Sequence, residues 1–230
     1  MVPHVWRGAL ALRLAGIVTL FGALLLSGCV GVGIGGTTGS GTVKSETRQV
    51  SGFTKISLSG VGELNITQTG QESLTVSAED NLLPLLTSTV SGDTLDLAVK
   101  SGSSIRPTKP IVYTLTVKNL DGVALSGAGS ITAKGIQTSA LDVTLSGAGS
   151  MTITGNGQSQ TVMVSGVGSY QAKGFQTAST HVTISGTGSA AVSVSQTLDA
   201  VVSGAGSVTY YGSPQVTKSV SGVGSIKQGQ

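Results

Sequence analysis

The stretch that best indicates the fold is SGAGSITAKGIQTSALDVTLSGAGS, residues 126–150. It begins and ends with the same pentapeptide. Close copies of the pentapeptide, Ser-Gly-x-Gly-Ser, follow at a nearly constant spacing along the rest of the chain. An earlier variant occupies residues 59–63 and ends in Glu. Self-similarity at a nearly fixed period indicates a repeat architecture. The later copies begin at Ser146, Ser165, Ser185, Ser203 and Ser221.

The residues on either side of this motif predict strands with one buried face. An aliphatic residue precedes every copy, Val or Ala stands two positions earlier in the first five, and a third column follows the motif. A period of two is typical of half-buried strands. We expect the central motif residues, Ala128, Ala148, Val167, Thr187, Ala205 and Val223, to stack inside a corner shaped by the glycines. The columns are Leu125, Leu145, Val164, Ile184, Val202 and Val220; Val123, Val143, Val162, Val182 and Ala200; Ile131, Met151, Tyr170, Ala190, Val208 and Ile226.

A repeat this short cannot bury its own apolar face, so neighbouring repeats must stack. We therefore predict an all-β fold, a single-stranded parallel β-helix of about eight coils with 18–20 residues per repeat. The right-handed form is favoured, because no six-residue period persists. The chain from Ser59 to Ser126 is expected to hold about three less regular turns, with a short helical or looped insertion at residues 82–86.

The composition narrows the possible partners. Aromatic residues are 3% and charged residues 10% of the chain, so the core must consist of Val, Ile, Leu and Ala. The mean hydropathy of +0.30 argues against a disordered chain. The sequence after residue 28 has no cluster of Lys and Arg and few rings to stack on bases, which excludes nucleic acid as a partner.

Residues 1–28 are expected to be a lipoprotein signal peptide. Arg7 and Arg13 supply its positive charge, and the apolar run 15–26 is too short to span a bilayer. The sequence Leu-Ser-Gly-Cys that ends at Cys29 resembles the lipobox of bacterial lipoproteins, so we expect acyl chains on Cys29 to hold the protein on a membrane. The alternative is a cysteine that happens to lie in an ordinary signal peptide.

This assignment divides the rest of the chain in two. Residues 29–41 would be the lipidated Cys and a glycine-rich flexible tether, and residues 42–230 the β-helix domain. Because Val30, and not Asp, follows the cysteine, the outer membrane is favoured over the inner membrane.

Few residues of the sequence are candidates for catalysis or ligand binding. An outward column four residues before each motif places His181 beside Asp199 at a spacing of ~5 Å, with Asp142 in the same column. Such a pair could act as base and orienter, but a solvent-facing polar pair is the expected role. Tyr211 is the one ring expected to be exposed for stacking on a sugar. These four residues are candidate surface contacts, and we expect no metal, no cofactor and no enzymatic activity.

Residues 47–59, TRQVSGFTKISLS, residues 60–86, GVGELNITQTGQESLTVSAEDNLLPLL, and the later repeats resemble a family of bacterial envelope proteins, the "putative auto-transporter adhesin, head GIN domain" family. The resemblance covers roughly residues 42–228. It implies a right-handed β-helix that often follows a signal peptide or lipobox, and it supplies no catalytic residues.

The function expected from these features is that of a non-catalytic, lipid-anchored envelope protein for adhesion, with a glycan or another surface polymer as partner. One alternative is a self-assembling structural element, because no capping helix follows Ile226 and the last strand would offer a free edge. A polysaccharide-active enzyme is the other alternative, and it rests on the fold only.

Overall fold

The computed structural model describes residues 35–230, which form one compact unit. The expected signal peptide, Cys29 and the first part of the expected tether lie outside the described residues. Within residues 35–230, no helix is long and apolar enough to cross a membrane.

The described chain consists of strands and one short 3-10 helix. The elements in chain order are β1 (Thr37–Thr38), β2 (Val43–Arg48), β3 (Lys55–Leu58), β4 (Val61–Gln68), β5 (Ser73–Glu79), η1 (Leu83–Leu85), β6 (Leu86–Ser91), β7 (Thr94–Val99), β8 (Ile105–Arg106), β9 (Val112–Val117), β10 (Gly122–Leu125), β11 (Ala128–Leu145), β12 (Ala148–Val164), β13 (Val167–Ile184), β14 (Ser189–Val202), β15 (Ser207–Tyr211), β16 (Gln215–Val220) and β17 (Ser225–Gln228).

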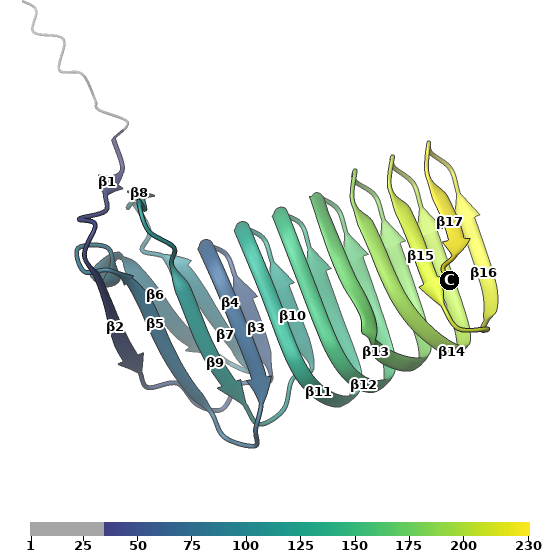
Figure 1. Ribbon diagram of the computed structural model, residues 1–230, viewed down its shortest axis with the longest axis horizontal. Helices are drawn as coiled ribbons and strands as arrows, with labels where there is room; N and C mark the ends of the chain where they lie inside the picture. The colour runs from purple at the N-terminus through teal and green to yellow at the C-terminus, as the bar shows by residue number, and fades with distance from the viewer. Residues whose placement is uncertain (1–34) are drawn as a thin grey trace, which may run out of the picture. The chain divides into compact units, whose positions relative to one another are not determined.

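The repeats form a parallel β-solenoid, as the sequence predicts (Figure 1). Each coil has a wall of residues before the motif and a second wall of residues after it. Neighbouring coils pair in register in both walls, since Val143 pairs with Val162 and Ile131 with Met151. All but two strands, β1 and β8, belong to one 15-stranded sheet. The handedness of the coil stays a prediction.

The three predicted inward columns are confirmed. From Val123 to Val208 their members are at most 2% exposed. The columns end at the last coil, where Ile226 is partly buried and Val220 is 43% exposed because no further coil of the described chain covers it. Aliphatic side chains stacked from coil to coil therefore form one continuous core.

The expectation for the motif corner is wrong. The central motif residues lie outside and not inside, with Val167 66% and Val223 93% exposed. The motif continues the alternation of the strand, so its two glycines point inward. A Cβ on Gly147 would overlap the carbonyl oxygen of Gly127, and a Cβ on Gly168 would lie 2.7 Å from Cδ2 of Leu145. Backbone and aliphatic side chains of the preceding coil already occupy this narrow edge.

The chain between Ser59 and Ser126 does not wind as three turns. Strand β3 pairs directly with β10, and β4 pairs with β11, so these two motif copies lie on adjacent coils. The intervening chain extends to the other side instead, where β7 pairs with β3 and β9 with β4. The solenoid therefore has about five turns, fewer than the eight expected.

Antiparallel strands close the N-terminal end of the solenoid. Strand β6 pairs antiparallel with β7, and β5 lies antiparallel between β2 and β9. The expected short insertion at residues 82–86 is present as η1. Arg48 stabilises η1, because its guanidinium donates hydrogen bonds to the carbonyl oxygens of Leu83 and Leu86 at 2.9 and 2.7 Å. Antiparallel pairing thus covers the parallel edge at this end.

The second half of the expected tether is part of the fold. Thr37 N donates to Ser104 O at 2.7 Å, and Gly39 N donates to Arg106 O at 3.0 Å, so β1 pairs with β8. Gly41 N donates to Oε1 of Glu79 at 2.7 Å. The fold therefore begins before residue 42, and residues 37–41 are hydrogen-bonded rather than a free linker.

The carboxylate of Glu79 ties three segments together. It accepts hydrogen bonds from Gly41 N, from both the hydroxyl and the N–H of Thr108, and from Lys109 N. The Thr108 hydroxyl makes the largest contribution to lowering its pKa from 4.5 to about 2, and the backbone donors lower it further. The side chain is buried, so these donors replace its water.

Gly166→Ala should destabilise the solenoid by about 1–3 kcal/mol, because the added methyl group would overlap the carbonyl oxygen of Gly147. Urea unfolding followed by circular dichroism measures the change. Val167→Ala, one residue on and exposed, is the matched control and should stay within about 0.5 kcal/mol of wild type. Equal losses in the two variants would contradict the close approach at the glycine.

Glu79→Gln should flatten the acid limb of the stability curve. The folded pKa is below the ordinary value, so the carboxylate stabilises the fold above pH 4.5 and this contribution is lost as the pH falls to about 2. Unfolding free energies measured across this window should fall less steeply in the variant than in wild type. The same slope in both proteins would refute this role of Glu79.

Candidate functional site

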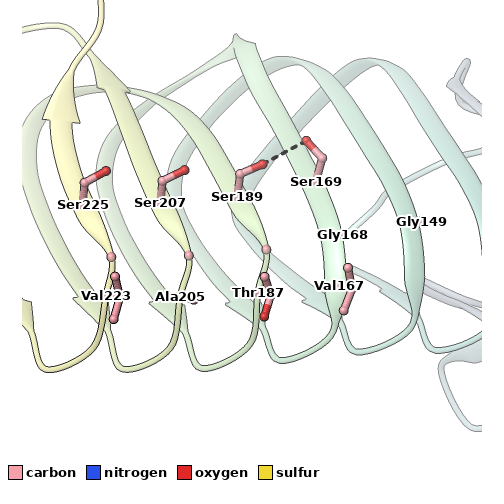
Figure 2. A pocket seen from close by; sticks show the side chains of 13 residues that line it. Gly149, Val167, Gly168, Ser169, Thr187, Ser189, Ala205, Ser207, Val223 and Ser225 are labelled. Atoms are coloured by element: carbon pink, nitrogen blue, oxygen red, sulfur yellow. Dashed lines mark hydrogen bonds between the residues drawn. The ribbon is translucent and has the colours of Figure 1, made fainter.

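A shallow groove of about 640 Å³ follows the narrow edge of the last coils, and we name it the glycine-edge groove (Figure 2). Its base is formed by inward-facing glycines, and two rows of outward side chains line it. Four residues from the motif centre form one row, and four serines that end the motif form the other. The rows are Val167, Thr187, Ala205 and Val223, and Ser169, Ser189, Ser207 and Ser225.

Strand pairing sets the spacing of these rows. Ser189 pairs with Ser169 on one side and with Ser207 on the other, so equivalent hydroxyls repeat at the strand spacing of ~4.8 Å. The Oγ of Ser189 donates to the Oγ of Ser169 at 3.3 Å. None of the described residues that line the groove is charged. The result is a neutral surface on which a methyl-bearing row and a hydroxyl row run side by side along the solenoid axis.

The sequence analysis missed this groove, because it placed the central motif residues inside the corner. The sequence does contain a signal for the outward position of these residues. Leu125 is inward, and continuing its alternation through the motif puts Ser126, Ala128 and Ser130 outside and both glycines inside. Treating the motif as a turn interrupted an alternation that the chain keeps.

The structure brings His181 and Asp199 together as predicted. They pair across neighbouring coils, and Nδ1 of His181 lies 3.0 Å from Oδ2 of Asp199. Asp142 is not part of the pair. It lies opposite Thr161, and Thr161 lies opposite His181, so two coil steps separate Asp142 from His181. The pair lines a second groove of about 340 Å³ whose other residues are mostly Ser, Thr and Gln.

Thr183 is a neighbour that the sequence analysis did not single out. Its hydroxyl lies 3.1 Å from Nε2 of His181, so the order hydroxyl, imidazole, carboxylate is that of a catalytic triad. Its place two residues after His181 on the same strand face was the available signal. The backbone of β13 here is committed to the ladders with β12 and β14, which leaves it no oxyanion donors, and the His181 and Asp199 side chains are 45% and 52% exposed.

The tyrosines lie close to where their positions predict. Tyr170 is buried, donates its hydroxyl to Oε1 of Gln160 at 2.9 Å, and has a pKa raised by burial. Tyr210 is partly buried against the core. Tyr211 is only partly exposed, and Nζ of Lys173 lies 4.2 Å from its ring centroid. One face of the ring expected to stack on a sugar is therefore occupied by a cation.

Within residues 35–230, no group of three or more His, Cys, Asp or Glu side chains is placed to hold a metal ion. The features that repeat from coil to coil are the two grooves, both lined by small and polar side chains. The fold and these grooves define the class of protein, a parallel β-solenoid with extended surface grooves.

The chain belongs to a particular family of this class, the "putative auto-transporter adhesin, head GIN domain" family, whose model matches residues 52–214. No curated protein sequence matches the chain significantly. Membership of this family indicates a cell-surface or envelope protein.

The solved structures that are similar to the chain include two "putative adhesins". A "putative adhesin" from Bacteroides fragilis is 27% identical, with a TM-score of 0.71, over 84% of this chain and 100% of the other. Another "putative adhesin", from Parabacteroides merdae, is 20% identical, with a TM-score of 0.50, over 84% of this chain and 99% of the other. The second likeness concerns the fold only.

Proposed function

We propose that this protein is a lipid-anchored adhesin of the bacterial cell envelope that binds a neutral surface polymer, such as a glycan, along the glycine-edge groove. The observation that carries the proposal is the repetition of one uncharged surface on successive coils. A linear polymer lying along the solenoid axis would meet the same methyl and hydroxyl groups at every coil.

The chemistry of the groove favours a sugar polymer over a charged one. Sugar rings present CH-rich faces and hydroxyl edges, which match the central row and the serine row. A polyanion or polycation would find no opposite charge in the groove lining. Repetition adds to the effect, because weak contacts at linked sites combine into a much stronger attachment.

The anchor part of the proposal rests on Cys29 and its lipobox. Acylation there would hold the protein on a membrane, and each buried methylene contributes about 0.8 kcal/mol. Val30 after the cysteine favours the outer membrane. Adhesion requires such a fixed point, since a binding surface that diffuses away holds nothing together.

Self-assembly is the second candidate, and the outer edges of β16 and β17, which pair with no further strand of the described chain, favour it. One residue opposes it. Lys218 pairs with Ala200, whose side chain is buried, so a lysine takes an inward-column position on the last coil. An inward-pointing charge on an edge strand disfavours the addition of another strand. We therefore rank polymer binding first.

Ala205→Arg should abolish retention of the protein on its polymer, because the long side chain would fill the groove where Ala205 lines it. Co-sedimentation with insoluble neutral polysaccharides measures retention. The unfolding midpoint should not change, since Ala205 is exposed.

The matched control for this substitution is Ala128→Arg, the same motif position on a coil that does not line the groove. The control should be retained like wild type. Retention of both variants, or of neither, would place binding somewhere other than the glycine-edge groove.

Intact mass measurement of the protein extracted from membranes tests the anchor. The expected mass is that of a chain that begins at Cys29 and carries acyl chains, and Cys29→Ser should leave the membrane fraction. A chain that keeps its first residues, or one that begins beyond Cys29 without lipid, would refute the lipoprotein assignment.

A further inference from the structure

We propose that the loop of residues 100–110, at the N-terminal end of the solenoid, contacts the anionic headgroups of a phospholipid membrane. Its orientation toward the membrane rests on the proposed anchor at Cys29, whereas its charge and geometry belong to the described fold. The contact would make this end of the solenoid a membrane-facing base, and the glycine-edge groove lies on the last coils, toward the other end of the solenoid.

The attachment of β1 limits how far the fold can stand from the anchor. Thr37 is hydrogen-bonded to Ser104, so the fixed part of the chain begins eight residues after Cys29. Eight residues span at most ~28 Å when fully extended. An acylated Cys29 would thus hold β1 close to the membrane, and its partner β8 lies in the middle of the loop (Figure 1).

The loop is basic. It contains Lys100, Arg106 and Lys109 and no acidic residue, and all three cationic residues are exposed. Each Lys or Arg near the surface of an anionic membrane is attracted to it by about 1 kcal/mol. A single acyl chain gives marginal binding, and a basic patch is a common second contribution.

The nearby carboxylates do not cancel this charge. Glu79 is buried and accepts hydrogen bonds from the loop itself, at Thr108 and Lys109. Asp80 lies 3.3 Å from Nζ of Lys44. Glu63 lines a pocket together with Lys109 and is the one acid beside it in the pocket. Glu79 and Asp80 are therefore already engaged by other groups of the fold, and Glu63 is the acid that lies beside Lys109.

The loop is held in shape, which keeps its cations in place. Ser103 N donates to Lys100 O at 2.9 Å and closes a turn, and Lys100 N donates to Leu85 O at 2.8 Å. Pro107 and Pro110 restrict the backbone on both sides of Lys109. A pre-formed basic surface loses less conformational entropy on contact with lipid than a flexible one.

The opposite end of the solenoid offers a matched comparison. Lys218 and Lys227 lie on the last two strands, β16 and β17, and are exposed. Six strand-to-strand steps lead from β4 to β17, which amounts to ~29 Å at the strand spacing. The two lysine pairs are therefore separated by more than two Debye lengths at physiological salt.

Vesicle co-sedimentation of residues 35–230 tests the proposal without any acyl chain. This unit is compact, and the B. fragilis structure is matched over its whole length by 84% of this chain, so we expect the unit to fold without the preceding segment. Wild type should bind vesicles that contain one third phosphatidylglycerol, should not bind phosphatidylcholine vesicles, and should dissociate at about 1 M salt.

Lys100→Gln combined with Lys109→Gln should lower the partition coefficient about 25-fold, or about fivefold for each lysine. Lys218→Gln combined with Lys227→Gln should leave it within about twofold of wild type. Equal binding to both lipid compositions, equal losses in the two double variants, or no binding of wild type to anionic vesicles would each overturn the proposal. A negative vesicle result would say nothing about acylation of Cys29, which the intact mass measurement tests separately. Absence of acyl chains on Cys29 would not change the vesicle result, because residues 35–230 do not include this cysteine.

Discussion

The close approach of the backbone at the motif glycines is the constraint on which the rest of the structure depends. Where the two walls of a coil meet, the carbonyl of one glycine lies where the next glycine would carry its Cβ, as Gly127 and Gly147 show. The walls can therefore join without a separate loop. Each coil stays short, every coil repeats in register, and the aliphatic columns on both sides stack into one core.

The same constraint assigns core packing and the groove surface to different positions of the repeat. Inward positions carry the packing, and the outward positions of the motif carry the groove. The ends are treated differently from each other. Antiparallel strands, Arg48 and Glu79 close the N-terminal end, whereas at the other end no strand of the described residues covers β16 and β17, and Lys218 takes an inward position.

Much of the fold could be predicted from the sequence, because the alternation of apolar residues and the regular return of the pentapeptide are both local signals. The pairing of His181 with Asp199 followed from the same register. The position of the motif's central residues was recoverable but was lost by assuming a turn. The stacking of Ser59 directly beside Ser126 was not recoverable, since it depends on pairing between strands far apart in the sequence and no local pattern encodes it. Hydrogen bonds of residues 37–41 to distant loops were hidden for the same reason.

The outward rows of the motif have a consequence for how such a protein can change over generations. Val, Thr and Ala all occur at the central position in this chain, and none of them disturbs the packing beneath. Under the proposed function, the polymer preference of the groove could change by single substitutions at little cost in folding. Duplication of one repeat would lengthen the groove by one equivalent set of side chains. The strength of the proposed binding would then depend on the number of coils rather than on the design of a single pocket.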